Sequence, residues 1–80
     1  MNKRSKNEIN FEVWKDLADG GRVYSVNVSG KHGWSAGYFK EVDASEITVR
    51  FWQEIYNEQG VLVELHEKYP VDSGHRSLKR

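Results

Sequence analysis

The chain has 80 residues and no cysteine, so we expect one small domain without disulfides, thiolate metal sites or a cysteine nucleophile. Its twelve Lys and Arg balance twelve Asp and Glu, but half of these cations lie near the ends, at positions 3, 4, 6, 76, 79 and 80. Residues 7–75 therefore hold six cations against twelve anions, a net charge of −6 that argues against a nucleic-acid partner for the body of the fold.

The polar start leads into no apolar run, which predicts neither a signal peptide nor a membrane span of roughly 20 residues. Together with the lack of cysteine, this favours a cytoplasmic protein. We expect a flexible basic N-terminus over residues 1–7, a single β-rich domain over 8–69, and a strand-ending turn with a basic C-terminal tail over 70–80.

The first segment of the domain fits two structures. Ser5 and Glu8 have the spacing of a capping box, and the apolar residues after them recur at helical intervals, which predicts a helix over 6–18. The helical spacing is that of Ile9, Val13 and Leu17, whereas Ile9, Phe11 and Val13 alternate in a run poor in strong helix formers, and this alternation favours a strand.

Farther along, short turn sequences separate four runs in which apolar residues alternate, a pattern typical of half-buried strands. Asn57 and Gly60 fit a type I turn followed by a glycine with positive φ. We therefore predict an all-β fold, a five-strand antiparallel meander that curls toward a partial barrel. The alternative is an α+β fold, in which a helix over 6–18 packs on a four-strand antiparallel sheet.

The turns also predict the register of each hairpin. We expect Val28 opposite Trp34, Val42 opposite Ile47, Ile55 opposite Val63, Glu54 opposite Glu64, Trp52 opposite His66, and Arg50 opposite Lys68. These registers gather most of the apolar residues on one face. Its members are Ile9, Phe11, Val13, Tyr24, Val26, Val28, Trp34, Ala36, Tyr38, Val42, Ile47, Val49, Phe51, Ile55, Val63, Leu65 and Tyr69. A bare face of this size needs a cover: sheet closure, an N-terminal helix, or a second copy in a homodimer.

The end of the chain places an acid, a hydroxyl and an imidazole within four positions, at Asp72, Ser73 and His75. A hydrolytic triad brings such groups together from separate parts of a fold, and neighbours in one loop cannot converge in that way. Pro70 cannot donate to a strand ladder, so we interpret this stretch as the turn that ends the last strand.

The polar face of the last hairpin is the strongest candidate for chemistry. Glu54 beside Glu64 would favour one raised pKa, with His66 as the acid and Arg50 or Lys68 holding phosphate charge, which is the equipment for phosphodiester cleavage. As binding candidates we name Trp52, Tyr56, Lys68 and His75. A metal held by Glu54, Glu64 and His66 is disfavoured by their ordinary surface character, so we expect neither metal nor cofactor.

Two functions follow. The leading hypothesis is a small non-enzymatic interaction module that binds an unidentified protein partner. The alternative is a small metal-independent phosphodiesterase or ribonuclease that uses the Glu, His and Arg constellation on one sheet face.

Overall fold

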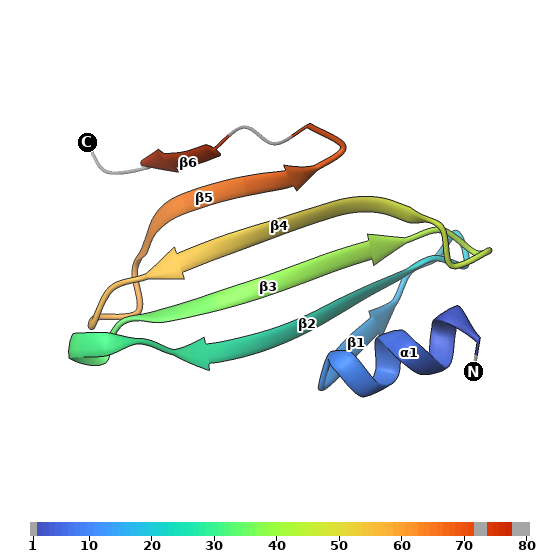
Figure 1. Cartoon of the computed structure of the whole chain (residues 1–80), viewed down its shortest axis with the longest axis horizontal. Helices are drawn as coiled ribbons and strands as arrows, with labels where there is room; N and C mark the ends of the chain where they lie inside the picture. Colours follow the sequence, from blue (N-terminus) through green and yellow to red (C-terminus); the bar gives the residue numbers. More distant parts are fainter. Residues whose placement is uncertain (1, 72–73, 78–80) are drawn as a thin grey trace.

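The computed structural model describes residues 2–71 and 74–77, which form one antiparallel sheet with a single helix before it (Figure 1). Six strands lie side by side in chain order, and the sheet stays open. The elements are α1 (Lys3–Asn10), β1 (Val13–Asp16), β2 (Arg22–Ser29), the 3-10 turn η1 (Lys31–Gly33), β3 (Ser35–Val42), β4 (Thr48–Tyr56), β5 (Leu62–Tyr69) and β6 (Gly74–Ser77). The predicted antiparallel meander is confirmed, without closure into a barrel.

The first segment contains both of the structures that its pattern suggested. Helix α1 starts earlier than the capping box implied, because the side chain of Asn2 caps it and accepts a hydrogen bond from the backbone N–H of Ser5, at 2.8 Å. It ends at Asn10, where Phe11 turns to extended backbone. The short strand β1 follows. The expected flexible terminus over residues 1–7 is thus corrected, since most of it belongs to α1.

The far end of the chain differs from the expected tail as well. Residues 74–77 form β6, which pairs with β5 and puts the backbone of His75 opposite His66. The chain therefore returns to the sheet after Pro70 instead of leaving it. Asp72 and Ser73, from the rejected triad, lie outside the described residues.

Three of the connecting turns share one hydrogen-bonding pattern. In the turn after β4, the carbonyl of Asn57 accepts from the N–H of Gly60 at 2.9 Å, and the Asn57 side chain accepts from Gln59 and Val61, each at 3.0 Å. Gly60 has a φ of 77°, as the sequence predicted. The turn after β3 repeats both parts of the pattern, with Asp43 in the place of Asn57 and Glu46 at the positive-φ position. The turn after β1 repeats the backbone hydrogen bond, from the N–H of Gly20 to the carbonyl of Leu17, and Gly20 has the positive φ.

Two hairpin registers differ from the predicted ones by two residues. Val28 lies opposite Ala36 instead of Trp34, because the loop with η1 is longer than a tight turn. In the next hairpin Val42 lies opposite Thr48 instead of Ile47, and Lys40 lies opposite Phe51 instead of Val49. The turn after β3 and a bulge beside Val42 each add one residue. A shift of two keeps every side chain on its predicted face, since strand side chains alternate.

The last hairpin is different, because its register shifts by one. Tyr56 lies opposite Leu62 as predicted, but a bulge follows, and Glu54 then lies opposite Leu65 instead of Glu64. A one-residue shift exchanges the two faces of β5 relative to β4. Leu65 therefore leaves the predicted apolar face, and Glu64 joins it.

The core is small and lies where α1 meets the sheet. Three apolar residues are buried, Phe11, Tyr24 and Val42, and Val26, Tyr38 and Phe51 pack against them. Several members of the predicted covered face stay exposed, among them Ile9, Val28 and Val49. Val13 is also exposed, and it pairs with Ser25 on the face opposite Tyr24. Helix α1 thus covers only one end of the face. In residues 2–71 and 74–77, no helix combines the length and apolar character needed to cross a bilayer.

Candidate functional site: the groove beside α1

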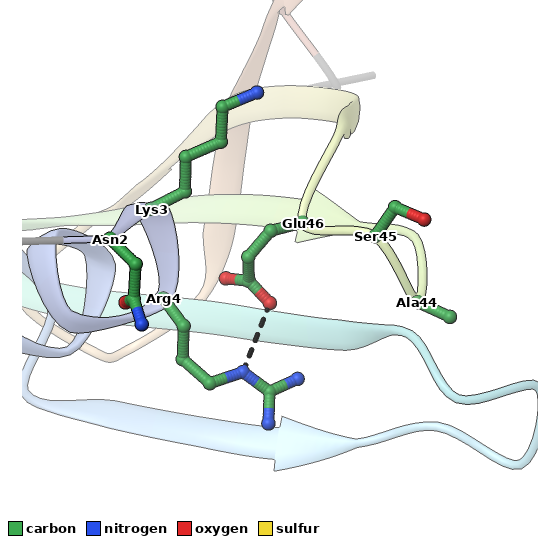
Figure 2. A pocket seen from close by; sticks show the side chains of 6 residues that line it. All are labelled: Asn2, Lys3, Arg4, Ala44, Ser45 and Glu46. Carbon is green, nitrogen blue, oxygen red and sulfur yellow. Dashed lines mark hydrogen bonds and ion pairs between the residues drawn. The ribbon is translucent and has the colours of Figure 1, made fainter.

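The carboxylate of Glu46 joins α1 to the sheet. It accepts hydrogen bonds from Tyr24 Oη at 2.5 Å, Asn7 Nδ2 at 3.1 Å and Arg4 Nε at 3.2 Å. Asn7 is itself buried and accepts from Lys40 Nζ at 2.9 Å. Figure 2 shows Arg4 reaching from the helix to Glu46. One carboxylate thus holds two helical residues and one core tyrosine in fixed positions.

Glu46 occupies a backbone position that its two counterparts give to glycine. Its φ is 67°, whereas the equivalent turn positions hold Gly20 with φ 90° and Gly60 with φ 77°. A non-glycine residue in the left-handed region costs on the order of 1 kcal/mol. The side chain offsets this cost through its three hydrogen bonds. We did not predict this role from the sequence, although the missing glycine in the turn was a visible signal.

The environment of Glu46 shifts two pKa values in opposite directions. Burial alone would raise the pKa of Glu46, but hydrogen bonds from Tyr24, Asn7 and Arg4 outweigh it, so the pKa lies below its ordinary value. The pKa of Tyr24 is raised, first by burial and then by its hydrogen bond to Glu46. Near neutral pH the pair is therefore a carboxylate with a neutral phenol as donor.

A second polar contact fixes the other side of the helix. The buried guanidinium of Arg22 donates to Asp16 Oδ1 at 2.6 Å and to Glu8 Oε2 at 2.8 Å. It also lies 5.2 Å from the ring centroid of Trp14. The hydrogen bond to Asp16 is the main reason why the pKa of Arg22 lies above its ordinary value. Helix, β1 and β2 meet at this cation.

Two hollows lie between α1 and the sheet, a third continues past the end of the helix at Phe11, and neighbouring hollows share lining residues. Their volumes are about 510, 330 and 520 Å³. We call them together the α1 groove, which is lined by Asn2, Lys3, Arg4, Lys6, Asn7, Asn10, Phe11, Lys40, Ala44, Ser45, Glu46, Ile47, Thr48, Phe51 and Tyr69. Figure 2 shows the residues of the first hollow, with the Lys3 side chain extending away from Glu46.

The groove is cationic at one end and apolar at the other. Four cations line it, and its single carboxylate, Glu46, is already occupied by three donors. Lys3 and Lys6 are exposed and form no ion pair within the described residues. The third hollow is walled by Phe11, Phe51 and Tyr69. These features suit an anion that carries an apolar group.

The predicted catalytic constellation does not assemble, because the bulge in β5 separates its members. Glu54 lies on the face of Trp52 and Tyr56, since its carboxylate accepts hydrogen bonds from both side chains. Glu64 pairs with Ile55 and His66 with Gln53, so both lie on the opposite face. The expectation that Glu54 and Glu64 share one face is therefore wrong.

The face that Glu54 does share is an aromatic one. Phe39 stacks on Trp52 with ring centroids 5.2 Å apart, and the Arg50 guanidinium lies 4.3 Å from the Trp52 ring centroid. Burial and the hydrogen bond to Glu54 raise the pKa of Tyr56 to about 12. The carboxylate of Glu54 thus holds Trp52 and Tyr56 together through two hydrogen bonds. The Arg50 guanidinium, which we expected to hold phosphate charge, lies over the Trp52 ring.

The remaining binding candidates are divided as well. Lys68 lies on the α1 side of the sheet, with Nζ 5.5 Å from the ring centroid of Tyr38 and 5.8 Å from that of Phe51. His75 is placed only through its backbone in β6. In the described part of the chain, no three acidic, histidine or cysteine side chains gather as metal ligands.

Comparison with protein families, curated proteins and solved structures finds no match for this chain.

Proposed function

We propose that this protein is a non-enzymatic interaction module that binds an acidic segment of a partner protein in the α1 groove. The observation that carries the proposal is the charge of the groove. Four cations line it against one carboxylate, and that carboxylate already accepts three hydrogen bonds. The basic residues near the start of the chain belong to a helix that Glu46 joins to the sheet, so their backbone positions lie beside the groove.

The apolar end of the groove supports a ligand that is more than a simple anion. Phe11, Phe51 and Tyr69 wall the third hollow, and Lys40 lines both it and the second hollow. An aromatic or aliphatic side chain placed there would leave water, while carboxylates one or two residues away would reach Lys3 and Lys6. An acidic segment with one apolar anchor satisfies both ends.

A protein ligand fits this chain better than a nucleic acid does. Nucleic-acid binding draws on several cations spread over a surface, whereas residues 7–75 carry a net charge of −6. That charge would repel a long phosphate backbone beyond the groove. A short acidic segment touches only the cationic rim.

The support for the enzymatic alternative has weakened. Acid–base cleavage requires Glu54, Glu64 and His66 to reach one substrate, and the sheet lies between the first and the other two. Arg50 lies against Trp52, on the same side of the sheet as Glu54 and on the side opposite Glu64 and His66.

The test is fluorescence anisotropy with a labelled peptide in which a single Trp is flanked by Glu and Asp. Two probes serve as comparisons: the same peptide with Gln and Asn, and a short single-stranded RNA. We expect binding of the acidic peptide to weaken about tenfold when Lys3 and Lys6 are both changed to Gln. The matched control changes Lys15 and Lys31 to Gln, which removes equal charge away from the groove.

An equal loss of affinity for the acidic peptide in both double variants would contradict the assignment of the groove as the binding site. Equal binding of the neutral peptide would contradict the role of the cations, and tighter binding of RNA would replace the protein ligand by a nucleic acid.

A further inference from the structure

One edge of the sheet is only half covered. Strand β1 pairs with Arg22–Ser25 of β2, and no described strand pairs with Val26–Ser29 on that side. Figure 1 shows β1 beside one half of β2, while the other half forms the border of the sheet. Asn27, Val28 and Ser29 are exposed, Val28 by 50%.

The packing of the core explains why β1 begins only at Val13 and leaves the rest of β2 unpaired on that side. Phe11 lies only two residues before β1, is 9% exposed, and lies 5.8 Å from the Tyr24 ring, centroid to centroid. The chain must leave the sheet edge at Glu12 to bring Phe11 beneath the sheet. Extension of β1 along β2 would therefore empty part of the core, and the open edge is a fixed feature of the fold.

This open edge lacks the usual protection of an edge strand. Natural edges carry charged residues or proline, which prevent another strand from pairing with them. The strand β1 follows this rule with Lys15 and Asp16. The open part of β2 reads Val-Asn-Val-Ser, with no charge and no proline. Its backbone is a template for one more antiparallel strand.

We propose that a second copy of this chain fills this edge, with β2 pairing antiparallel to its own copy across a two-fold axis at Val28. Val28 then lies opposite Val28 of the second copy, Asn27 opposite Ser29, and Val26 opposite Gly30. This register uses the whole open edge. A register centred on Asn27 would instead put Ser29 of the second copy opposite Ser25, a place that Val13 already occupies.

The geometry on both sides of the axis is compatible with such a pair. A two-fold axis perpendicular to the sheet keeps both helices on the same face, so Val26 and Val28 of the two copies form one apolar row. Beyond Gly30 the chain turns into η1, so Lys31 of the second copy comes to the end of β1, beside the exposed Glu12. Opposite charges therefore meet where the pairing ends.

The decisive experiment is a cysteine cross-link at Val28, since the chain has no cysteine of its own. Residues directly opposite in an antiparallel pair have Cα atoms about 4.5–5.5 Å apart, within the range of a disulfide. We expect Val28→Cys to form a disulfide-linked dimer under mild oxidation. Val61→Cys is the control, because Val61 is 54% exposed and lies in a hairpin loop.

Light scattering after size exclusion gives the second readout. We expect the wild type to show a concentration-dependent dimer, and Val28→Lys to weaken it at least about tenfold, because two ammonium groups would then face each other. Val61→Lys should leave the dimer intact. A wild type that stays monomeric at every concentration would overturn the proposal, as would equal cross-linking of the two cysteine variants or a Val28→Lys protein that dimerises normally.

Discussion

The phenol of Tyr24 donates a 2.5 Å hydrogen bond to the carboxylate of Glu46, and this bond links the most buried side chain of the sheet to the turn beside α1. Tyr24 is fully buried, and the Glu46 side chain is 9% exposed. The pair therefore exchanges almost no hydrogen bonds with water. Loss of this hydrogen bond should therefore affect both the stability of the core and the position of α1.

We expect Tyr24→Phe to lower the free energy of unfolding by about 1–3 kcal/mol, because a buried carboxylate loses one of its three donors. Urea denaturation measures this change. A double-mutant cycle with Glu46→Gln should give a coupling of at least about 0.5 kcal/mol. Additive effects would show that the two groups stabilise the fold independently.

The turn position of Glu46 leads to a second prediction. Glu46→Gly removes the cost of a positive φ but also removes an acceptor of three hydrogen bonds, so we expect a net loss of about 1 kcal/mol or more. At the equivalent turn position, Gly60→Ala should cost about 1 kcal/mol through backbone strain alone, since a Cβ there meets no atom within 4 Å. A gain in stability from Glu46→Gly would mean that its contacts do not offset the strain.

The lowered pKa of Glu46 predicts a loss of stability in acid. The folded state holds this carboxylate ionised below its ordinary pKa of 4.5, so its contribution is complete above that value and disappears as the pH falls through the folded pKa. Denaturation from about pH 7 to about pH 3 should show the difference between wild type and Glu46→Gln shrinking in that range. A constant difference at all pH values would contradict this assignment.

Phe51 and Trp52 lie on opposite faces of the sheet, and each packs against a different group of residues. Phe51 packs against the core, so Phe51→Ala should cost about 3 kcal/mol. Trp52 stacks on Phe39 and donates to Glu54, so we expect Trp52→Ala to cost about 2 kcal/mol. Chemical denaturation of both variants tests the order. If Trp52→Ala is the more damaging change, the aromatic face contributes more than the core beneath α1.

Gly37 gives the aromatic face its close packing. An added Cβ would lie 2.8 Å from Phe39 Cε2 and 3.1 Å from Asn27 Oδ1, so Gly37→Ala must move the Phe39 ring from Trp52. We expect a cost of about 1–3 kcal/mol and a changed near-UV circular dichroism signal. The double variant Gly37→Ala with Phe39→Leu should recover part of the stability. Without recovery, the strain would lie in the backbone and not in the ring.

The alternation of apolar residues predicted the strands well, because burial on one face of a sheet repeats every two residues. The register errors before β5 did little harm, since one loop was longer by two residues, and a turn and a bulge together added two more, which left Tyr24, Tyr38 and Phe51 on the correct face. The hairpin after β4 was predicted correctly at its turn and wrongly beyond it. No residue type marks the bulge next to the Tyr56–Leu62 pair, so the sequence does not indicate that Glu64 lies on the other face.

The candidate site was harder to predict, because it depends on contacts between distant segments. Lys3, Arg4 and Lys6 look like part of a solvated tail in the sequence, and only the docking of α1 makes them part of a groove. The turn at Glu46 offered the one local signal, a glutamate at a position that calls for glycine. Side chains that meet across long sequence distances, such as Asn7 and Lys40, leave no such trace.

The way in which α1 is attached determines how the molecule opens. Of the apolar residues at this end, Phe11 anchors the segment while Ile9 is 66% exposed, and the other links are the polar contacts of Arg4, Asn7 and Glu8. Such a helix can detach while the central strands stay paired. Its amide hydrogens should therefore be less protected from exchange with solvent than those of β3, and acid should lower their protection factors first, since the Glu46 contacts weaken on protonation.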